Sequence, residues 1–197
     1  EEPGDALLSQ VSDGFENLPS GARVGTGSRR RRSQLLHARN DLQILDIRGN
    51  VDTRLRKLDE GQFDAIVLAQ AGLRRLGLQD RITQVIPLVV MLPAVGQGAL
   101  GLETRSDDAV SIGQVATLDD AATHAAVIAE RAMLAELRGG CLAPVGAWGR
   151  VVGERLCLDG VVLSVDGAQR VAAVAEGGLG DADALGRQVA RDLISQG

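Results

Sequence analysis

Aromatic side chains are nearly missing from this sequence of 197 residues, which has one Trp, two Phe and no Tyr. Proteins that bind single-stranded nucleic acid commonly stack the bases on aromatic rings. A net charge of −5 also argues against a polyanionic partner. We therefore do not expect the protein to bind nucleic acid.

Cysteines and long apolar runs are scarce as well. Cys141 and Cys157 are too few for a disulfide framework, and their spacing does not match a zinc site. No stretch approaches the roughly 18 apolar residues that span a bilayer, and no charged-then-apolar leader opens the chain. We expect a cytoplasmic protein with no metal or membrane partner. Because the chain starts at Glu1 and not at a methionine, we also expect it to be a fragment.

Positive charge is concentrated in one region of the chain. Residues 21–60 carry ten Lys or Arg against five Asp or Glu, whereas residues 1–20 carry five acidic groups and no basic one. Lys57 is the only lysine, so nearly all of this charge is guanidinium, which can hold a carboxylate through two hydrogen bonds. The pattern predicts a focused anion site in an acidic protein.

Short apolar runs alternate with helical periods from Arg23 onward, which predicts an α/β fold with a parallel-rich sheet and helical crossovers. Ligands of such sheets lie beyond the carboxyl ends of the strands. The residues at those ends are Thr26, Ser28, Arg30, Arg48 and Ala69. We expect strands at 23–25, 42–47 and 65–69, and helices at 29–38, 51–60 and 71–76.

The second half of the chain has a different texture. Residues 93–99 resemble a hinge that leads into a strand ending at Glu103, and residues 119–137 form the longest helical period. Alternating apolar positions and hairpin signals then predict a small C-terminal α+β domain. Its strands are expected at 145–152, 156–165 and 169–175, and its closing helix at 181–195.

Two segments have residue types that fit a binding site. Gly25 to Ser28, followed by four arginines, places free backbone N–H groups and positive charge at a helix N-terminus, which favours an anion. The alternative is a capped helix with a solvated basic face. Arginines at the next two strand-to-helix turns, Arg48 with Arg54 and then Arg75, favour the anion site.

The second segment, Gly139-Gly140-Cys141, places a cysteine on a glycine turn that would suit a covalent attachment. The alternative is that Cys141 is a small buried apolar residue. His37 and His124 are expected to be solvated. The sequence contains no catalytic triad, phosphate-binding glycine loop with lysine, or dinucleotide fingerprint, so hydrolase, kinase and dehydrogenase functions are not indicated.

Several ordered motifs together resemble the porphobilinogen deaminase family, also called hydroxymethylbilane synthase. They run through nearly the whole chain: Val24-Gly25-Thr26-Gly27-Ser28 with Arg30-Arg31, Arg48-Gly49-Asn50 with Thr53-Arg54-Leu55, Lys57-Leu58-Asp59, Ala69 with Ala71-Gly72-Leu73, Leu92 to Ala99, Ala129-Glu130-Arg131 and Gly139-Gly140-Cys141. The resemblance implies stepwise condensation of four porphobilinogen units into hydroxymethylbilane with loss of ammonia, in tetrapyrrole biosynthesis.

The resemblance also implies a cofactor and its ligands. Cys141 would hold a dipyrromethane cofactor through a thioether, and arginines would bind the acetate and propionate groups of cofactor and substrate. Hydroxyl and backbone contacts would line the same cleft. The implied arginines are Arg30, Arg31, Arg48, Arg54 and Arg75, and the other implied lining residues are Thr26, Ser28, Ala69 and Gly98.

The resemblance further implies a domain plan. Residues 1–95 would form a second domain like a periplasmic binding protein, residues 96–118 a returning segment of an otherwise missing first domain, and residues 119–197 the C-terminal domain. The catalytic aspartate is expected upstream of Glu1, so no catalytic residue is assigned here and impaired activity is expected. The family is expected to be monomeric. Gly27 and Arg29 depart from the usual serine and leucine.

A different class of function stays open at this point. A small-anion-binding module without chemistry, of the periplasmic-binding-protein type, would also explain the arginine-rich turns. Such a module has no need of Cys141 on its glycine turn, so cofactor attachment at that residue distinguishes the two.

Overall fold

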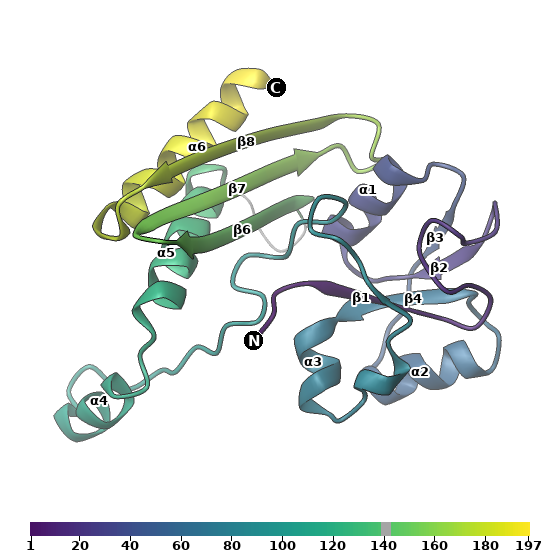
Figure 1. The fold of residues 1–197 in the computed structure, drawn as a ribbon, viewed down its shortest axis with the longest axis horizontal. Coiled ribbons are helices and arrows are strands. Elements are labelled where there is room, and N and C mark those ends of the chain that lie inside the picture. Colours follow the sequence, from purple (N-terminus) through teal and green to yellow (C-terminus); the bar gives the residue numbers. More distant parts are fainter. Residues whose placement is uncertain (139–142) are drawn as a thin grey trace.

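The computed structural model describes residues 1–138 and 143–197, and Figure 1 shows two sheets, each with its own helices. The first sheet has five strands in the order β3-β2-β4-β1-β5. β3, β2 and β4 run parallel, whereas β1 is antiparallel to β4 and β5. The strands are β1 (Asp5–Ser9), β2 (Arg23–Gly25), β3 (Gln43–Leu45), β4 (Ala65–Ala69) and β5 (Gln84–Val85).

Helices cover both faces of this sheet, and its strands are therefore buried on both sides. Leu7 and Val67 pack with Leu35 of α1 on one face, and Ile66 packs with Leu55 of α2 on the other. We call residues 5–85 the first unit; its α/β class confirms the prediction. The helices are α1 (Arg29–Ala38), α2 (Val51–Asp59), α3 (Gln70–Arg75) and the short η1 (Gln79–Arg81).

A separate antiparallel sheet, in the order β6-β7-β8, forms the C-terminal unit, residues 121–196. Two helices pack on one of its faces, where Met133, Leu158 and Val189 are fully buried. This confirms the predicted α+β arrangement. Its elements are α5 (Ala121–Glu136), β6 (Val145–Val152), β7 (Arg155–Leu163), β8 (Arg170–Gly177), η2 (Leu179–Asp181) and α6 (Ala182–Gln196).

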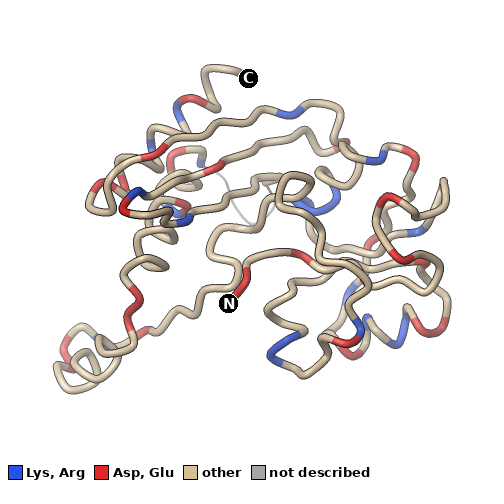
Figure 2. The backbone as a smooth tube through the Cα atoms, in the orientation of Figure 1, with Lys and Arg blue, Asp and Glu red and all other residues tan. Residues whose placement is uncertain are grey.

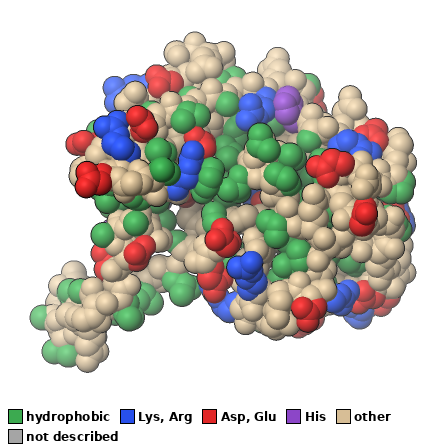
Figure 3. Space-filling view, in the orientation of Figure 1, with side chains coloured by type: hydrophobic (Ala, Val, Ile, Leu, Met, Phe, Trp, Pro, Cys, Tyr) green, Lys and Arg blue, Asp and Glu red, His purple; other side chains and the backbone are tan. Residues whose placement is uncertain are grey.

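The predicted strand ending at Glu103 is wrong. Residues 93–108 contain no helix or strand, and a short helix that was not predicted, α4 (Ala109–Ala116), follows them. No strand in the described part of the chain pairs with this segment in a ladder, although the Ala147 N–H of β6 donates a hydrogen bond to the Pro93 carbonyl. Leu100 and Leu102 are 74% and 60% exposed there. Figures 1 and 3 show α4 and the part of the chain directly before it projecting away from both sheets, with apolar side chains on the surface.

The strand β1 was not predicted, although it lies between β4 and β5 near the middle of the first sheet. Its apolar run is only Ala6, Leu7 and Leu8, preceded by an acidic residue, and these three side chains are at most 1% exposed. Among the helices that the structure describes, none combines the length and apolar character needed to cross a bilayer.

Candidate functional site

The carboxyl ends of the three parallel strands lie along one edge of the first sheet. Thr26 and Ser28 follow β2, Arg48 follows β3, and Ala69 ends β4. Ser28 is the N-cap of α1: its hydroxyl accepts a hydrogen bond from the Arg31 backbone N–H at 3.4 Å. The Ser28 N–H in turn donates to the Thr26 hydroxyl at 3.2 Å. These contacts fix the start of α1 at this edge.

Arg30 and Arg31, in the first turn of α1, converge on one carboxylate. An Arg30 Nη atom lies 2.7 Å from one oxygen of Asp5, and an Arg31 Nη atom lies 2.8 Å from the other. Asp5 is fully buried, and the two arginines are 5% and 9% exposed. The site therefore contains two buried guanidinium groups and one buried carboxylate, with an excess of positive charge.

The charges around Asp5 determine its protonation state. Burial alone would raise the pKa of Asp5, but the nearby charges of Arg30 and Arg31 and hydrogen bonds from Arg30 and Gln97 outweigh it. The pKa of Asp5 is consequently lowered below its ordinary value, and the carboxylate stays ionised. In the part of the chain that the structure describes, the Arg30 Nε atom has no hydrogen-bond partner.

Residues 92–97, which follow the first unit and which we call the connecting segment, complete this cluster. Arg30 donates to the Leu92 carbonyl at 2.6 Å and to the Gln97 side-chain oxygen at 3.3 Å. The Gln97 amide nitrogen donates to Asp5 at 2.9 Å. Gln34 of α1 donates to the Leu92 carbonyl and accepts from its N–H. Helix α1 is thus attached to residues 92–97 through polar contacts.

Of the two arginines at the next turn, Arg48 is exposed and Arg54 is half-buried. The Arg48 side chain is 89% exposed, and its Nε atom donates to Asp46 at 3.0 Å. Arg54, in the first turns of α2, donates from Nε to the Gly49 carbonyl at 2.8 Å. Figure 2 shows basic residues on the helices of the first unit. The exposed guanidinium of Arg48 has room to meet a carboxylate ligand.

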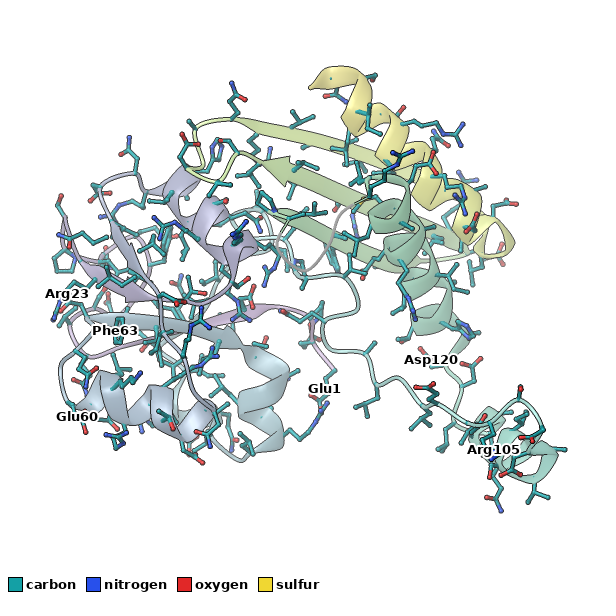
Figure 4. All side chains as sticks on the ribbon, turned by 180° about the vertical axis from the view of Figure 1, so that it is seen from behind. Glu1, Arg23, Glu60, Phe63, Arg105 and Asp120 are labelled. Atoms are coloured by element: carbon teal, nitrogen blue, oxygen red, sulfur yellow. The ribbon has the colours of Figure 1, made fainter. Side chains whose placement is uncertain are left out.

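Arg75 and Gly98 both contact the first residue of the chain. Arg75, at the end of α3, pairs with the Glu1 carboxylate at 3.4 Å. The Glu1 amino group donates to the Gly98 carbonyl at 3.3 Å. Gly98 has a φ of +90°, and a Cβ there would lie 2.7 Å from the Glu1 carbonyl oxygen, so this close approach requires glycine. Figure 4 labels Glu1 on the side of the first unit where α3 lies.

The predicted site residues therefore fall into three groups along the molecule. Arg30 and Arg31 share one buried carboxylate, Arg48 and Arg54 share the turn between β3 and α2, and Arg75 and Gly98 share Glu1. The other three, Thr26, Ser28 and Ala69, lie at the ends of β2 and β4. Sequence reasoning gave no role to Asp5, Gln34 or Gln97. The available signal for Asp5 was its position directly before the apolar run Ala6-Leu7-Leu8. An acid buried with that run needs a cationic partner.

The predicted attachment residue, Cys141, lies outside the described residues. Its neighbour five positions along the chain, Gly146, is described and packs on the connecting segment: a Cβ at Gly146 would lie 2.9 Å from Leu92 Cβ. The Ala147 N–H also donates to the Pro93 carbonyl at 2.9 Å.

Glu130 of α5 joins the connecting segment to β6. Its two carboxylate oxygens accept hydrogen bonds from the Gly96 N–H at 2.6 Å and the Gly149 N–H at 2.7 Å. Burial raises the pKa of Glu130, and these two hydrogen bonds oppose the shift. The side chain is 7% exposed. It also lines a cavity of about 270 Å³ whose walls include Trp148 and Arg150.

Fold and site together define an α/β protein with arginines at the carboxyl edge of a parallel sheet segment, joined to a small α+β unit. Residues 1–112 match the family model "Porphobilinogen deaminase, dipyromethane cofactor binding domain", and residues 124–195 match "Porphobilinogen deaminase, C-terminal domain". The chain belongs to the porphobilinogen deaminase family, as the resemblance of its motifs predicted.

Curated relatives agree with the family models. The chain is 53% identical over 197 residues to the porphobilinogen deaminase of Desulforudis audaxviator, covering all of this chain and 64% of the relative. It is 50% identical over 196 residues to that of Roseiflexus castenholzii, again covering all of this chain and 64% of the relative. The chain thus spans slightly less than two thirds of the length of these relatives.

Proposed function

We propose that this chain supplies the cofactor-binding and C-terminal parts of a hydroxymethylbilane synthase. The reaction is the stepwise condensation of four porphobilinogen units into hydroxymethylbilane with release of ammonia, a step of tetrapyrrole biosynthesis. The names of the family models and relatives support this function. The structural observation that carries it is the pair of buried guanidinium groups, Arg30 and Arg31, at the edge where the parallel strands end.

The proposed cofactor is dipyrromethane, joined by a thioether to Cys141. The donor set fits such a polyacid: guanidinium groups dominate, the Asp5 cluster has excess positive charge, and the Arg30 Nε atom has no partner among the described residues. When bound, the cofactor would supply the free pyrrole end to which substrate units are added. We propose that it occupies the edge of the sheet where β2, β3 and β4 end.

The chain's own residues would bind and orient carboxylates there. The exposed Arg48 and the half-buried Arg54 would hold acetate or propionate groups through paired hydrogen bonds. Arg30 and Arg31 would add positive potential from a buried position, where screening by water is weak. The hydroxyls of Thr26 and Ser28, the backbone at Ala69 and Gly98, and Arg75 complete the proposed set. We assign no proton-handling residue within the chain.

The proposed domain plan follows the sequence expectation. Residues 1–95 would be a second domain of the periplasmic-binding-protein type, residues 96–118 a segment that returns to a separate first domain, and residues 119–197 the C-terminal domain. The exposure of Leu100 and Leu102 and the lack of a described strand beside them support a separate assignment for residues 96–118. We also propose a cytoplasmic, monomeric enzyme.

Mass spectrometry of the chain after incubation with porphobilinogen tests the proposal. We expect an adduct of two pyrrole units on the peptide that contains Cys141, and none after Cys141→Ser. Cys157→Ser is the matched control, because Cys157 lies half-buried in β7 and should leave loading unchanged. Anion binding without any adduct would favour the small-anion-binding module instead.

A further inference from the structure

The turn between β7 and β8, residues 164–169, contacts a helix of the other unit. Figures 1 and 4 show it beside α1 in opposite views. The hydroxyl of Ser33 donates to the Val165 carbonyl at 3.2 Å. The Nδ1 atom of His37 lies 2.9 Å from the Gly167 carbonyl, which can only accept, so Nδ1 carries the proton in this contact. We call residues 164–169 the docking turn.

Gly167 fits closely against the backbone of α1. It is buried and has a φ of +75°, and a Cβ there would lie 2.5 Å from the Ser33 carbonyl oxygen and 2.7 Å from the His37 nitrogen. Those two atoms belong to residues i and i+4, the pair that an α-helical hydrogen bond joins. Only glycine therefore allows the turn to approach α1 so closely.

The docking turn is braced by its own hydrogen bonds. The Asp166 carboxylate accepts from the Ser164 hydroxyl at 2.5 Å and from the Ala168 N–H at 3.1 Å. The Gln169 N–H donates to the Ser164 hydroxyl at 2.9 Å. A turn held in this way presents a defined surface to the helix, because its backbone has few other conformations available.

Helix α1 is consequently held at both ends by different parts of the chain. Its first turn is fixed by the ion pairs of Arg30 and Arg31 with Asp5, and its last turns are covered by the docking turn. We propose that the docking turn is a positioning element that fixes the C-terminal unit against α1 and so sets the distance between that unit and the arginine pair. This inference does not depend on the proposed reaction.

Hydrogen exchange of the full chain tests the positioning role, with Gly167→Ala as the variant. Gly153→Ala is the matched control: Gly153 is in the β6–β7 turn with a φ of +61°, and no atom lies within 4 Å of a Cβ there. Both substitutions strain a left-handed residue, but only the first meets α1. We expect amides of residues 33–38 to exchange at least about tenfold faster in Gly167→Ala than in Gly153→Ala.

Exchange in β1 and β4 should stay equal in the two variants, since the centre of the first sheet does not contact the turn. The emission of Trp148, the single tryptophan, gives a second readout, because this side chain packs beside Leu92 where the units meet. A red shift confined to Gly167→Ala supports loosened contact between the units. Equal exchange in α1 and equal emission in the two variants would overturn the proposal.

A second pair of variants covers the case in which Gly167→Ala does not fold. His37→Ala removes one hydrogen bond to the docking turn without adding an atom. The control is His124→Ala, because His124 is also exposed on a helix and its ring lies within hydrogen-bond distance of Asp119, at 2.9 Å, and not of the docking turn. We expect exchange at residues 164–169 to rise about threefold in His37→Ala alone. No difference between the two histidine variants would contradict the proposal.

Discussion

The carboxylate of Asp5 lies 2.7 Å from the guanidinium of Arg30, and both side chains are at least 95% buried. Removing two such charges from water costs several kcal/mol each, and the cost is offset only by their mutual attraction and further hydrogen bonds. Arg31 and Gln97 supply those further contacts. The pair therefore joins β1 to the start of α1. The sequence pattern predicted this helix but not the strand.

Asp5→Asn should destabilise the chain by about 3–5 kcal/mol, because it leaves Arg30 and Arg31 buried without their counter-charge. Urea denaturation followed by circular dichroism measures this change. Asp107→Asn is the control: Asp107 pairs with Arg105 at 2.6 Å, but both side chains are at least 66% exposed. The control should stay within about 0.5 kcal/mol of the parent chain.

Acid gives an independent check on the same residue. The pKa of Asp5 is lowered from 3.8 in the folded state, so the folded chain binds fewer protons at this group than the unfolded chain. Its contribution is present above pH 3.8 and is lost as pH falls through the lower, folded value. The free energy of unfolding should therefore fall more steeply below pH 3.8 in the parent than in Asp5→Asn. Parallel curves would contradict the ion-pair account.

Glu130 should show the opposite pH dependence. Burial raises its pKa above 4.5, so the folded state binds more protons at this group than the unfolded state. The stability linked to its protonation is complete below pH 4.5 and is lost as pH rises through the folded pKa. The free energy of unfolding of the parent, minus that of Glu130→Gln, should fall across this interval. A constant difference between the two chains would contradict the shift.

Two helix glycines should respond with opposite signs to alanine. Gly186 of α6 crosses α5 so closely that a Cβ would overlap the Ala129 carbonyl, and we expect Gly186→Ala to cost about 1–3 kcal/mol. Gly113 of α4 has no atom within 4 Å of a Cβ, so Gly113→Ala should raise the helicity of α4 and stabilise it by about 0.5–1 kcal/mol. Denaturation curves and far-UV circular dichroism compare them. Equal effects would contradict the close packing of α5 on α6.

Much of the fold could be predicted because local patterns agree with the final packing. The helix at Arg29–Ala38 and the strand at Ala65–Ala69 have the expected bounds, since capping by Ser28 and a continuous apolar run act locally. The strand expected to end at Glu103 is wrong because strand formation needs a neighbour, which the sequence pattern does not show. β1 was missed for the converse reason: its pairing with β4 is non-local.

The candidate site could be predicted only as a set of residue types. Sequence spacing indicated that Arg30 and Arg48 lie at the same sheet edge, and the parallel strands β2 and β3 agree with this. It could not show that Arg30 is buried against Asp5 while Arg48 is 89% exposed. Burial and partner choice depend on contacts between residues far apart in the chain, such as Arg30 with Leu92.

That difference in exposure leads to a test of the proposed carboxylate ligands. Arg48→Ala should leave the free energy of unfolding within about 0.5 kcal/mol, because the side chain is 89% exposed and its ion pair with Asp46 lies at the surface. It should reduce loading of the cofactor about tenfold or more, the effect of losing a charge-assisted hydrogen bond of about 1.5–3 kcal/mol. The intact mass of the chain, followed over time with porphobilinogen, measures the loading.

Arg56→Ala is the matched control for this last test. Arg56 is on α2 and pairs with Glu60 at 2.8 Å, with its side chain 63% exposed, so its removal also deletes one surface guanidinium. Arg56 is not part of the proposed site, so Arg56→Ala should load the cofactor like the parent chain. If loading falls equally in the two variants, the effect comes from the overall charge of the surface. A fall in Arg48→Ala alone locates a carboxylate contact at the turn between β3 and α2.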